Sequence, residues 1–365
     1  QDMGTNLLID DRWEHINGGD GFSCGFSYLD DTIAYFSTQN MRIRRADNLY
    51  KYLYDLNKSG GYRSQSISVN GQSGFYTKFH ISPSSPELLF FPGYDGLYKS
   101  TDKGDSWLKQ EGLRSNRVFA FSETNPDLLA LEADTFYMEN GENKYIYRIG
   151  ISDNKGGSWE FLEVYSSAFD LFEYSRNLVA LTFDADNLDK IWAAYIGNGF
   201  CHVFHTNNRG ETWTNQSKGL PHIKMNDLKY QPYSDDALYL ATDMGVYYRD
   251  TIIKEWIPYN KNLPLTEITE LKISSVAEKL RASTYGSGIW EVDLYDASKN
   301  PPFSNFNCKK TTICQGESAN WNSLTTYDAE DIQWQFEGGT PSTSTKETQQ
   351  VIYSEAGEFS ITLIS

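Results

Sequence analysis

The strongest constraint on the fold of this chain is an eight-residue pattern that occurs three times in the sequence. The pattern reads S/T-x-D/N-x-G-x-S/T-W, and its copies are residues 100–107, 152–159 and 206–213. Self-similarity at a spacing of about fifty residues is typical of proteins built from stacked structural repeats. In such proteins each repeat buries its apolar surface against its neighbours. The sequence therefore predicts a repeat architecture.

Each position of the pattern has a chemical role in a tight turn. The Asp or Asn at the third position can accept hydrogen bonds from backbone N–H groups of the turn. The fifth-position Gly supplies a positive φ, and the Ser or Thr before the Trp can bond back across the turn. The Trp then packs between sheets, where its flat side chain buries a large area. We interpret the pattern as a structural staple, in preference to a calcium or ligand site, formed by Ser100, Asp102, Gly104, Trp107, Ser152, Asn154, Gly156, Trp159, Thr206, Asn208, Gly210 and Trp213.

Runs with the composition of β-strands surround each copy of the pattern. Around the first copy these runs are residues 76–83, 87–93, 96–100 and 107–110. Four short strands in each repeat are typical of a β-propeller blade. Units without a complete pattern cover residues 22–45, 227–256 and 268–294. We count about six units and predict an all-β propeller over residues 1–295.

The ends of this repeat region allow two arrangements of the ring. The last unit lacks an outer strand, whereas the segment around Trp13 has the character of an outer strand without inner strands of its own. Pairing of these two segments would close a ring of about six blades. Alternatively, the ring is larger and earlier blades have been removed.

The sequence changes character after Leu294. Residues 296–302 have the composition of a linker. Residues 303–365 contain short alternating segments, which predict a small β-sandwich that we expect to be truncated at its end. Cys308 and Cys314 are close enough in the sequence to bridge a hairpin with a disulfide bond.

Composition argues against several classes of protein. The formal net charge of -17 is spread along the chain, so the phosphate backbone of a nucleic acid would be repelled. No apolar run reaches the roughly 18 residues that a membrane-spanning helix needs. The 4 Cys are too few for a disulfide scaffold in 365 residues. The chain begins without an apolar signal segment, so we expect that a signal was cut away or that the sequence is an internal fragment.

The repeated pattern resembles the Asp-box, or BNR repeat, of sialidase-like and Vps10/sortilin-like β-propellers. Residues 1–5 (QDMGT), Trp13 and residues 16–22 (INGGDGF) are similar to a QDNGT…W…INGGDGF segment, with Met3 in place of Asn. That segment occurs in large secreted Vps10/sortilin-like glycosyl-hydrolase-type propellers of Bacteroidetes. Residues 284–291 (TYGSGIWE) are similar to the TYGRGVWE segment that closes these propellers, with Ser287 in place of Arg. The resemblance implies blades before residue 1, which favours the fragment interpretation.

The C-terminal part resembles a PKD domain, which is an immunoglobulin-like β-sandwich. Residues 334–341 (WQFEGGTP) match its W-x-F-x-G-G-x-P core, and residues 351–359 match its V-x-Y…A-G-x-Y/F strand. Together the resemblances cover nearly the whole chain and imply a secreted, modular bacterial protein at the cell surface. They also imply type IX secretion or outer-membrane components as partners, although no sorting domain for that route is visible in the sequence.

The family resemblance raises the question of glycosidase activity. Sialidases bind a carboxylate with three arginines, but Arg42 and Arg44 alternate along a strand, which indicates a solvated face. Xyloglucanase-like propellers use two carboxylates across a cleft. Asp20, in a Gly-Gly-Asp-Gly turn, is the best single candidate for a catalytic residue, although a turn cap is the simpler interpretation. Asp95 and Asp243 lie in similar turns and are expected to be structural.

Histidine and cysteine do not form a recognisable catalytic or metal-binding set in the sequence. His202 and His205 are an odd number of residues apart, so they point to opposite faces of a strand and cannot share a metal ion. No Cys/His cluster has the spacing of a zinc site. Cys24 and Cys201 are expected to be small buried hydrophobic residues. We predict no cofactor, with calcium as the alternative.

The sequence favours a non-catalytic role. The propeller would be a rigid scaffold or a surface that binds a protein or glycan, and the C-terminal domain a spacer or further binding module. One alternative is a glycoside hydrolase fragment acting on polysaccharide, in which Tyr94, Tyr195 and Tyr285 would stack on sugar rings. Another is a cargo or subunit of a cell-envelope secretion assembly. Carboxylates that converge at the centre of the ring would favour the enzyme.

Overall fold

β-Sheet forms nearly all of the regular structure in the computed structural model of this protein. The one helix among the described residues is α1 (Leu49–Asp55), which Asn48 caps by accepting from Lys51 N at 2.8 Å. The structure describes residues 4–9, 12–27, 30, 32–56, 58, 63–69, 71, 75–76, 78–113, 118–122, 125–133, 135–140, 142–146, 148–163, 177–197, 200–260, 262–274, 277–296, 306–308, 310–323 and 332–364. Gln1–Met3 of the family resemblance and residues 297–302 of the expected linker lie outside these ranges.

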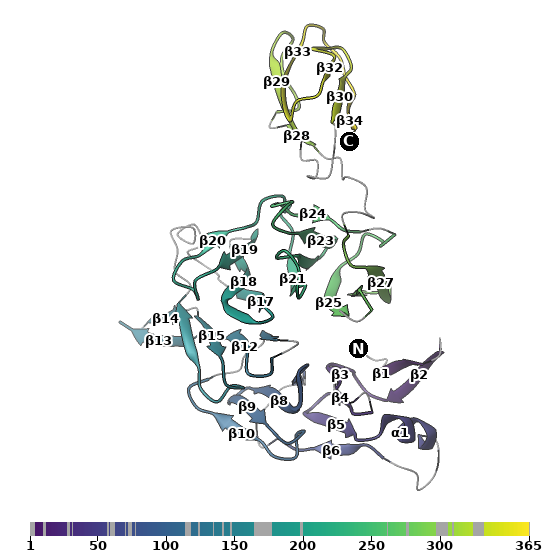
Figure 1. The fold of residues 1–365 in the computed structure, drawn as a ribbon, viewed down its shortest axis with the longest axis vertical. Coiled ribbons are helices and arrows are strands. Elements are labelled where there is room, and N and C mark those ends of the chain that lie inside the picture. Colours follow the sequence, from purple (N-terminus) through teal and green to yellow (C-terminus); the bar gives the residue numbers. More distant parts are fainter. Residues whose placement is uncertain are drawn as a thin grey trace.

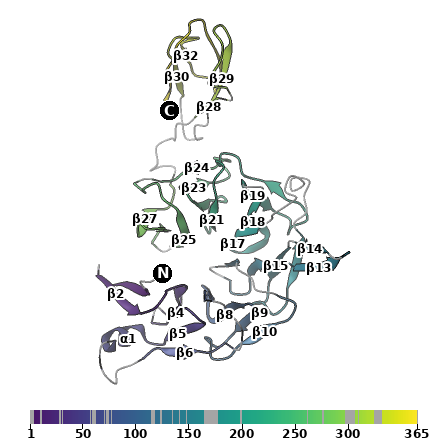
Figure 2. The same ribbon diagram turned by 180° about the vertical axis from the view of Figure 1, so that it is seen from behind.

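Six antiparallel sheets follow one another around an arc, and we call them blades 1 to 6 (Figures 1 and 2). The strands of each blade are given from the innermost outward. Blade 1 consists of β3 (Cys24–Phe26), β4 (Ala34–Thr38), β5 (Arg42–Ala46) and β6 (Gln65–Ile67), and blade 2 of β7 (His80–Ser82), β8 (Ser85–Gly93), β9 (Gly96–Ser100) and β10 (Leu108–Gln110). Blade 3 consists of β11 (Phe119–Phe121), β12 (Leu129–Glu132), β15 (Arg148–Ser152) and β16 (Glu160–Glu163). A separate hairpin, β13 (Thr135–Glu139) and β14 (Glu142–Ile146), is inserted in blade 3.

The later blades continue the same order. Their strands are β17 (Asn177–Asp184), β18 (Asn187–Gly197), β19 (Phe200–Thr206) and β20 (Thr214–Asn215) in blade 4; β21 (Met225–Tyr230), β22 (Leu238–Thr242), β23 (Gly245–Arg249) and β24 (Ile257–Pro258) in blade 5; and β25 (Ile268–Ser274), β26 (Lys279–Thr284) and β27 (Ile289–Asp293) in blade 6. Among the described residues, blade 6 is therefore the one blade with three strands instead of four.

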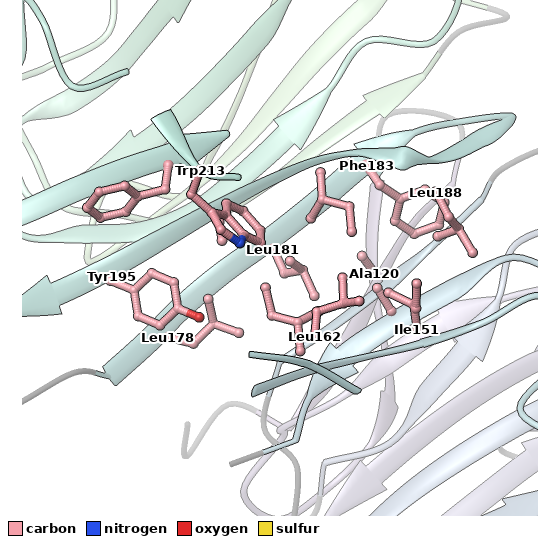
Figure 3. Close-up of a cluster of buried hydrophobic side chains, with 14 residues drawn as sticks. Ala120, Ile151, Leu162, Leu178, Leu181, Phe183, Leu188, Tyr195 and Trp213 are labelled. Carbon is pink, nitrogen blue, oxygen red and sulfur yellow. The ribbon is translucent and has the colours of Figure 1, made fainter. Parts of the chain in front are cut away.

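Apolar side chains hold neighbouring blades together face to face. Every residue of β22 is buried because both faces of its sheet are covered. Leu238 and Leu240 pack toward blade 4, whereas Tyr239 and Ala241 pack toward blade 6. Figure 3 shows the equivalent cluster between blades 3 and 4, where Leu162 and Ile151 meet side chains of β17. The propeller core is thus a series of layers between blades.

The three repeated turns share three hydrogen bonds. In the first, Ser100 Oγ donates to Asp102 Oδ1 and accepts from Gly104 N, both at 2.8 Å, and Asp102 Oδ1 accepts from Ser106 N at 2.9 Å. Each fifth-position Gly has the expected positive φ, between +69° and +88°. The equivalent bonds join Ser152, Asn154, Gly156 and Ser158 in the second turn, and Thr206, Asn208, Gly210 and Thr212 in the third.

Each repeated turn also touches the preceding blade. A Cβ on Gly156 would lie 3.0 Å from Phe90 of blade 2 and 3.0 Å from Trp159 of its own turn. The corresponding contacts with the preceding blade are Gly104 with Ile67 and Gly210 with Leu162. Glycine is therefore required at the fifth position for two reasons: the backbone has a positive φ, and the neighbouring blade approaches closely. The pattern joins blades as well as closing a hairpin.

Arg45 of β5 ties blade 1 to the first repeated turn. Its side chain is buried and donates to Asp105 Oδ1 at 2.9 Å and to Lys103 O at 2.5 Å. Within its own blade it donates to Asp47 and Gln65. A buried guanidinium is stable only when its N–H groups have such partners, so Arg45 is a fixed link between the two blades.

The ring is not closed by pairing of its ends. Among the described residues, β2 (Arg12–Asn17) pairs only with β1 (Thr5–Ile9), and β27 pairs only with β26. Closure by pairing the Trp13 segment with the last unit, one of the two arrangements considered from the sequence, is therefore absent. After β27 the chain turns back to blade 5. Tyr295 stacks on Tyr248 with ring centroids 4.1 Å apart, and its N–H donates to the Tyr239 hydroxyl at 2.7 Å.

The two ends of the arc carry different surfaces. The β1–β2 hairpin and α1 cover the outward face of blade 1, where Tyr52 Oη donates to Ile16 O at 2.7 Å and both pack with Phe36. The outward face of blade 6 is charged, and its strands β26 and β27 are joined there by the Arg281–Glu291 ion pair at 2.6 Å and by a second Lys–Asp pair. An apolar blade face would need a neighbour, whereas this charged face is stable in water.

The strands beyond residue 305 form two small sheets that lie outside the ring in Figure 1. The first is β28 (Phe306–Cys308), β29 (Ser318–Ser323), β33 (Thr348–Tyr353) and β31 (Gly339–Thr340), and the second is β32 (Thr343–Ser344), β30 (Gln333–Phe336) and β34 (Ile361–Ile364). Their shared core contains Trp321, Trp334 and Val351.

The disulfide considered between Cys308 and Cys314 is absent from the structure, where both residues are free thiols. The backbone around each cysteine is held by other bonds. Cys308 Sγ donates to Lys310 O at 3.2 Å, and Cys314 N donates to Glu317 Oε2 at 3.1 Å.

We predict that Gly156→Ala destabilises the protein more than Gly112→Ala. Gly112 has a φ of +75°, and nothing lies within 4 Å of the position that a methyl group would take there, so its variant isolates backbone strain of about 1 kcal/mol. At Gly156 the contacts with Phe90 and Trp159 add overpacking of ~1–3 kcal/mol. Urea unfolding followed by tryptophan fluorescence measures both changes. Equal losses of unfolding free energy would contradict the interblade contact.

Arg45→Met is expected to lower the free energy of unfolding by about 2–3 kcal/mol, because Lys103 O loses the shorter of its two hydrogen bonds and two carboxylates lose their cation. Asp105 is 64% exposed, so water replaces part of that interaction and the loss stays below that of a fully buried pair. Arg42→Met, at an exposed position of the same strand, is the matched control, expected within ~0.5 kcal/mol of the parent. Urea unfolding curves that coincide for the two variants would show that the link contributes nothing.

Candidate functional site

One end of the blades gathers the segments that lead into the innermost strands, and we call it the loop end. It includes residues 18–23 before β3 and residues 75–76 and 78–79 before β7, together with the turns at residues 94–95 and 243–244. Successive antiparallel strands run in opposite directions, so the turn between the second and third strands of a blade lies at the loop end. The repeated turns connect the third and fourth strands and therefore lie at the opposite end. Loops on a rigid scaffold are common positions for binding residues. The loop end is therefore the candidate site.

Carboxylates on the innermost strands of blades 5 and 6 are bound by lysines. Asp227 Oδ1 accepts from Lys229 Nζ at 2.8 Å, and Asp227 Oδ2 accepts from Leu271 N of blade 6 at 2.9 Å. Glu270 lies 3.1 Å from Lys272, and both side chains are more than half exposed, at 54% and 60%. Desolvation alone would raise the pKa of Glu270, but Lys272 and Lys229 outweigh it and hold that pKa below its usual value. Both carboxylates therefore have a lysine partner, and the lowered pKa keeps Glu270 ionised near neutral pH.

His80, on the innermost strand of blade 2, is held as a neutral imidazole. Its ring stacks on Phe119 with centroids 4.4 Å apart, and its Nε2 is buried without a hydrogen-bond partner. Desolvation, aided by the positive charges of Lys78 and Lys272, lowers the pKa of His80 to about 3. The ring therefore carries no charge near neutral pH.

Cys24, on the innermost strand of blade 1, corrects the expectation of a buried hydrophobic residue, because it is exposed. An innermost strand faces the ring axis, where no further blade covers it. Reduced solvation of the thiolate raises the pKa of Cys24, and the Glu270 carboxylate adds to this effect. A thiol with a raised pKa is a poor nucleophile. The side chain of Cys201 lies outside the described residues.

Asp20, the candidate catalytic residue from the sequence, lies in a turn at the loop end. Its N–H donates to Gln39 Oε1 at 3.0 Å, which fixes the segment before β3 against the β4–β5 turn. Asp95 accepts from the Tyr98 hydroxyl at 2.5 Å, and Asp243 accepts from an asparagine side chain at 3.0 Å. All three acidic residues thus lie in segments that hydrogen bonds hold in place.

Three aromatic rings that the sequence analysis did not single out meet at the loop end. Phe22, Phe75 and Tyr76 have ring centroids 5.0–5.8 Å apart. Phe75 is 46% and Tyr76 63% exposed. In the sequence, these residues could have been found as aromatic residues in Gly- and Ser-containing segments that directly precede a strand. We call these three residues the aromatic cluster.

The other residues singled out in the sequence are dispersed in the structure. Tyr94 and Tyr285 are exposed at loop-end turns, but Tyr195 is buried in the layer between blades 3 and 4 and is unavailable to a sugar. Arg42 is exposed as expected, whereas Arg44 is half-buried and donates to Ser64 Oγ at 3.3 Å. These positions do not form a common site.

His202 and His205 both lie on β19 but contact different groups. His205 stacks on Trp192 with centroids 4.6 Å apart, and His202 Nδ1 is 3.3 Å from Asn215 Nδ2. Across the described ranges, no group of three or more His, Cys, Asp and Glu side chains could hold a metal ion. In the same part of the chain, no helix has the length and apolar character needed to cross a membrane.

Comparison with solved structures shows a β-propeller. An ancestral GH74 enzyme aligns with 85% of this chain at a TM-score of 0.55 and 14% identity, and this chain spans 44% of that enzyme's length. A chain from the COPII outer coat vertex on membranes aligns with 87% of this chain at a TM-score of 0.51 and 11% identity, with 81% of its own length covered. YCF48 from Cyanidioschyzon merolae aligns with 85% of this chain at a TM-score of 0.48, 11% identity and 94% coverage of its own length.

No known family profile and no curated protein matches the chain. At these low identities the likeness to solved structures concerns the fold alone. The β-propeller fold predicted from the repeats is therefore confirmed.

We predict that the protein loses stability in acid partly through His80 and His205. Desolvation lowers the pKa of His205 to about 4 and is also the main cause of the value of about 3 at His80. Below the unfolded pKa of about 6.5 the unfolded chain binds protons that the folded chain does not, so each residue costs about 1.4 kcal/mol per pH unit until its folded pKa is reached. The unfolding free energy of the parent minus that of His80→Phe should therefore fall by about 1.4 kcal/mol per pH unit as the pH drops from about 6.5 toward about 4. A constant difference across that window would contradict the prediction.

Proposed function

We propose that this chain is a non-catalytic binding module of a secreted or cell-surface protein. In this proposal an Asp-box propeller of the Vps10/sortilin-like type presents its loop end to a protein or glycan, and a PKD-like sandwich acts as a spacer or second binding module. The repeated turns have the hydrogen bonds and positive-φ glycines that an Asp-box role requires. Association with an outer-membrane or type IX secretion component is part of the same proposal.

The observation that carries the proposal is the pairing of axial carboxylates with lysines. A glycosidase of the two-carboxylate type needs a proton donor whose pKa is raised by an apolar or anionic environment. Here Asp227 is bound by Lys229 and by Leu271 N, and the pKa of Glu270 lies below its usual value. A carboxylate with a lowered pKa, such as that of Glu270, can form hydrogen bonds and ion pairs with a ligand but does not donate a proton near neutral pH.

The rigidity of the scaffold supports the same role. Five of the described blades have four strands, and buried layers, repeated turns and the Arg45 link hold them in fixed positions. The loop end therefore presents its side chains with little conformational freedom, which reduces the entropy cost of binding. Exposed aromatic residues at that end supply the contact area that binding sites use.

A hydrolysis assay tests the proposal against its main rival, a glycoside hydrolase. The full chain is incubated with xyloglucan, other soluble β-glucans and sialylated glycans, and released reducing ends and free sialic acid are measured. We expect release by the parent chain to equal that by Asp20→Ala and Glu270→Gln, at the level of a buffer blank. Product release that one of these substitutions abolishes, in a variant with an unchanged unfolding curve, would overturn the non-catalytic assignment.

A further inference from the structure

The aromatic cluster is held in place by backbone bonds to blade 1. Phe22 N donates to Ser37 O at 3.3 Å, which extends the β3–β4 ladder beyond Cys24. Asn40 N donates to Phe75 O at 3.3 Å, so the segment before β7 is attached to the β4–β5 turn. Two segments that enter neighbouring blades are thus bonded to β4 and to the turn that follows it. The three rings are preorganised, although two of them are largely exposed to water.

The angles between the rings decide which ligand the cluster suits. The interplanar angles are 78°, 64° and 88°, so each ring presents an edge to the face of another. A sugar ring stacks on a broad aromatic face, and three mutually tilted rings do not form a continuous platform. They form a protruding apolar corner of the kind that inserts between side chains of a protein partner. The described contacts leave the Tyr76 hydroxyl free to bond with that partner.

The charge of the chain further narrows the partner. The net charge of -17 repels acidic surfaces and accelerates the approach of basic ones. Faces of aromatic rings also attract guanidinium and ammonium groups. A protein segment that combines Arg or Lys with apolar residues would satisfy both the charge and the cluster.

We propose that Phe22, Phe75 and Tyr76 dock a basic, apolar-containing segment of a protein partner. This inference rests on the proposed binding function and names its partner class. Phe75 and Tyr76 supply the protruding surface, and Phe22, which is less exposed, supports them from the β3 side. The attraction from net charge acts at a distance, whereas the aromatic contact determines the site.

A display experiment tests this proposal on the full chain. The probe is a library of random linear peptides displayed on yeast and selected against the parent protein. We expect enriched peptides to contain Arg or Lys beside apolar residues. Their affinity should fall at least tenfold, about 1.4 kcal/mol, with Phe75→Ala/Tyr76→Ala, as for the removal of interface anchors. Rising salt should weaken binding to the parent chain.

The matched control is Tyr94→Ala, because Tyr94 is an exposed tyrosine of another loop-end turn and is 71% exposed. We expect it to keep parent affinity. Tyr76→Phe retains the ring, so it keeps most of the affinity if the cluster acts through its aromatic surface. Unfolding curves of all variants establish that each is folded, which is expected because the substituted side chains are exposed.

Two other outcomes would overturn the inference. Enriched peptides that bind the double variant as tightly as the parent would place the docking point elsewhere. Selection of neutral glycans on a glycan array, lost in the double variant while the peptide library yields no binder, would assign the cluster to carbohydrate. Either outcome leaves the non-catalytic proposal intact, whereas hydrolysis of a polysaccharide would overturn that proposal without testing the cluster.

Discussion

The close approach of neighbouring blades is the constraint on which the rest of the structure depends. Gly156 can touch Phe90 of blade 2 because it lacks a Cβ, and its φ is positive. Gly104 and Gly210 have corresponding contacts with the preceding blade, at Ile67 and Leu162. Blades 5 and 6 lack the pattern, and Asp227 joins them by accepting from Leu271 N. Different chemistry thus maintains the same layered packing around the arc.

The ends of the arc follow from the same need to cover apolar blade faces. Blade 1 has an apolar outward face, and the β1–β2 hairpin with α1 covers it. Blade 6 has a charged outward face, which cross-strand ion pairs such as Arg281–Glu291 keep stable in water. Among the described residues blade 6 has three strands, and beyond β27 Tyr295 packs with Tyr248 of blade 5.

Electrostatics at the axis and geometry at the loop end point to binding. Lysines pair with the carboxylates of Asp227 and Glu270, Lys272 and Lys229 hold the pKa of Glu270 below its usual value, and desolvation keeps His80 neutral. The loop end instead presents apolar rings whose backbone is fixed by Ser37 and Asn40. A rigid surface with exposed aromatic residues is suited to recognition of a partner, which is the function that we propose.

The sequence by itself determined the repeat class, because the Asp or Asn, Gly and Trp of each turn interact within eight residues. Local chemistry of that kind can be recognised without a structure. Only the tertiary structure decided that Cys24 is exposed, that Tyr195 is buried and that the Trp13 strand pairs with β1. It also brought Phe22 beside Phe75 and Tyr76, which lie about fifty residues away in the chain. Such outcomes depend on which blade faces meet and which loops converge, and no local pattern records contacts between distant segments.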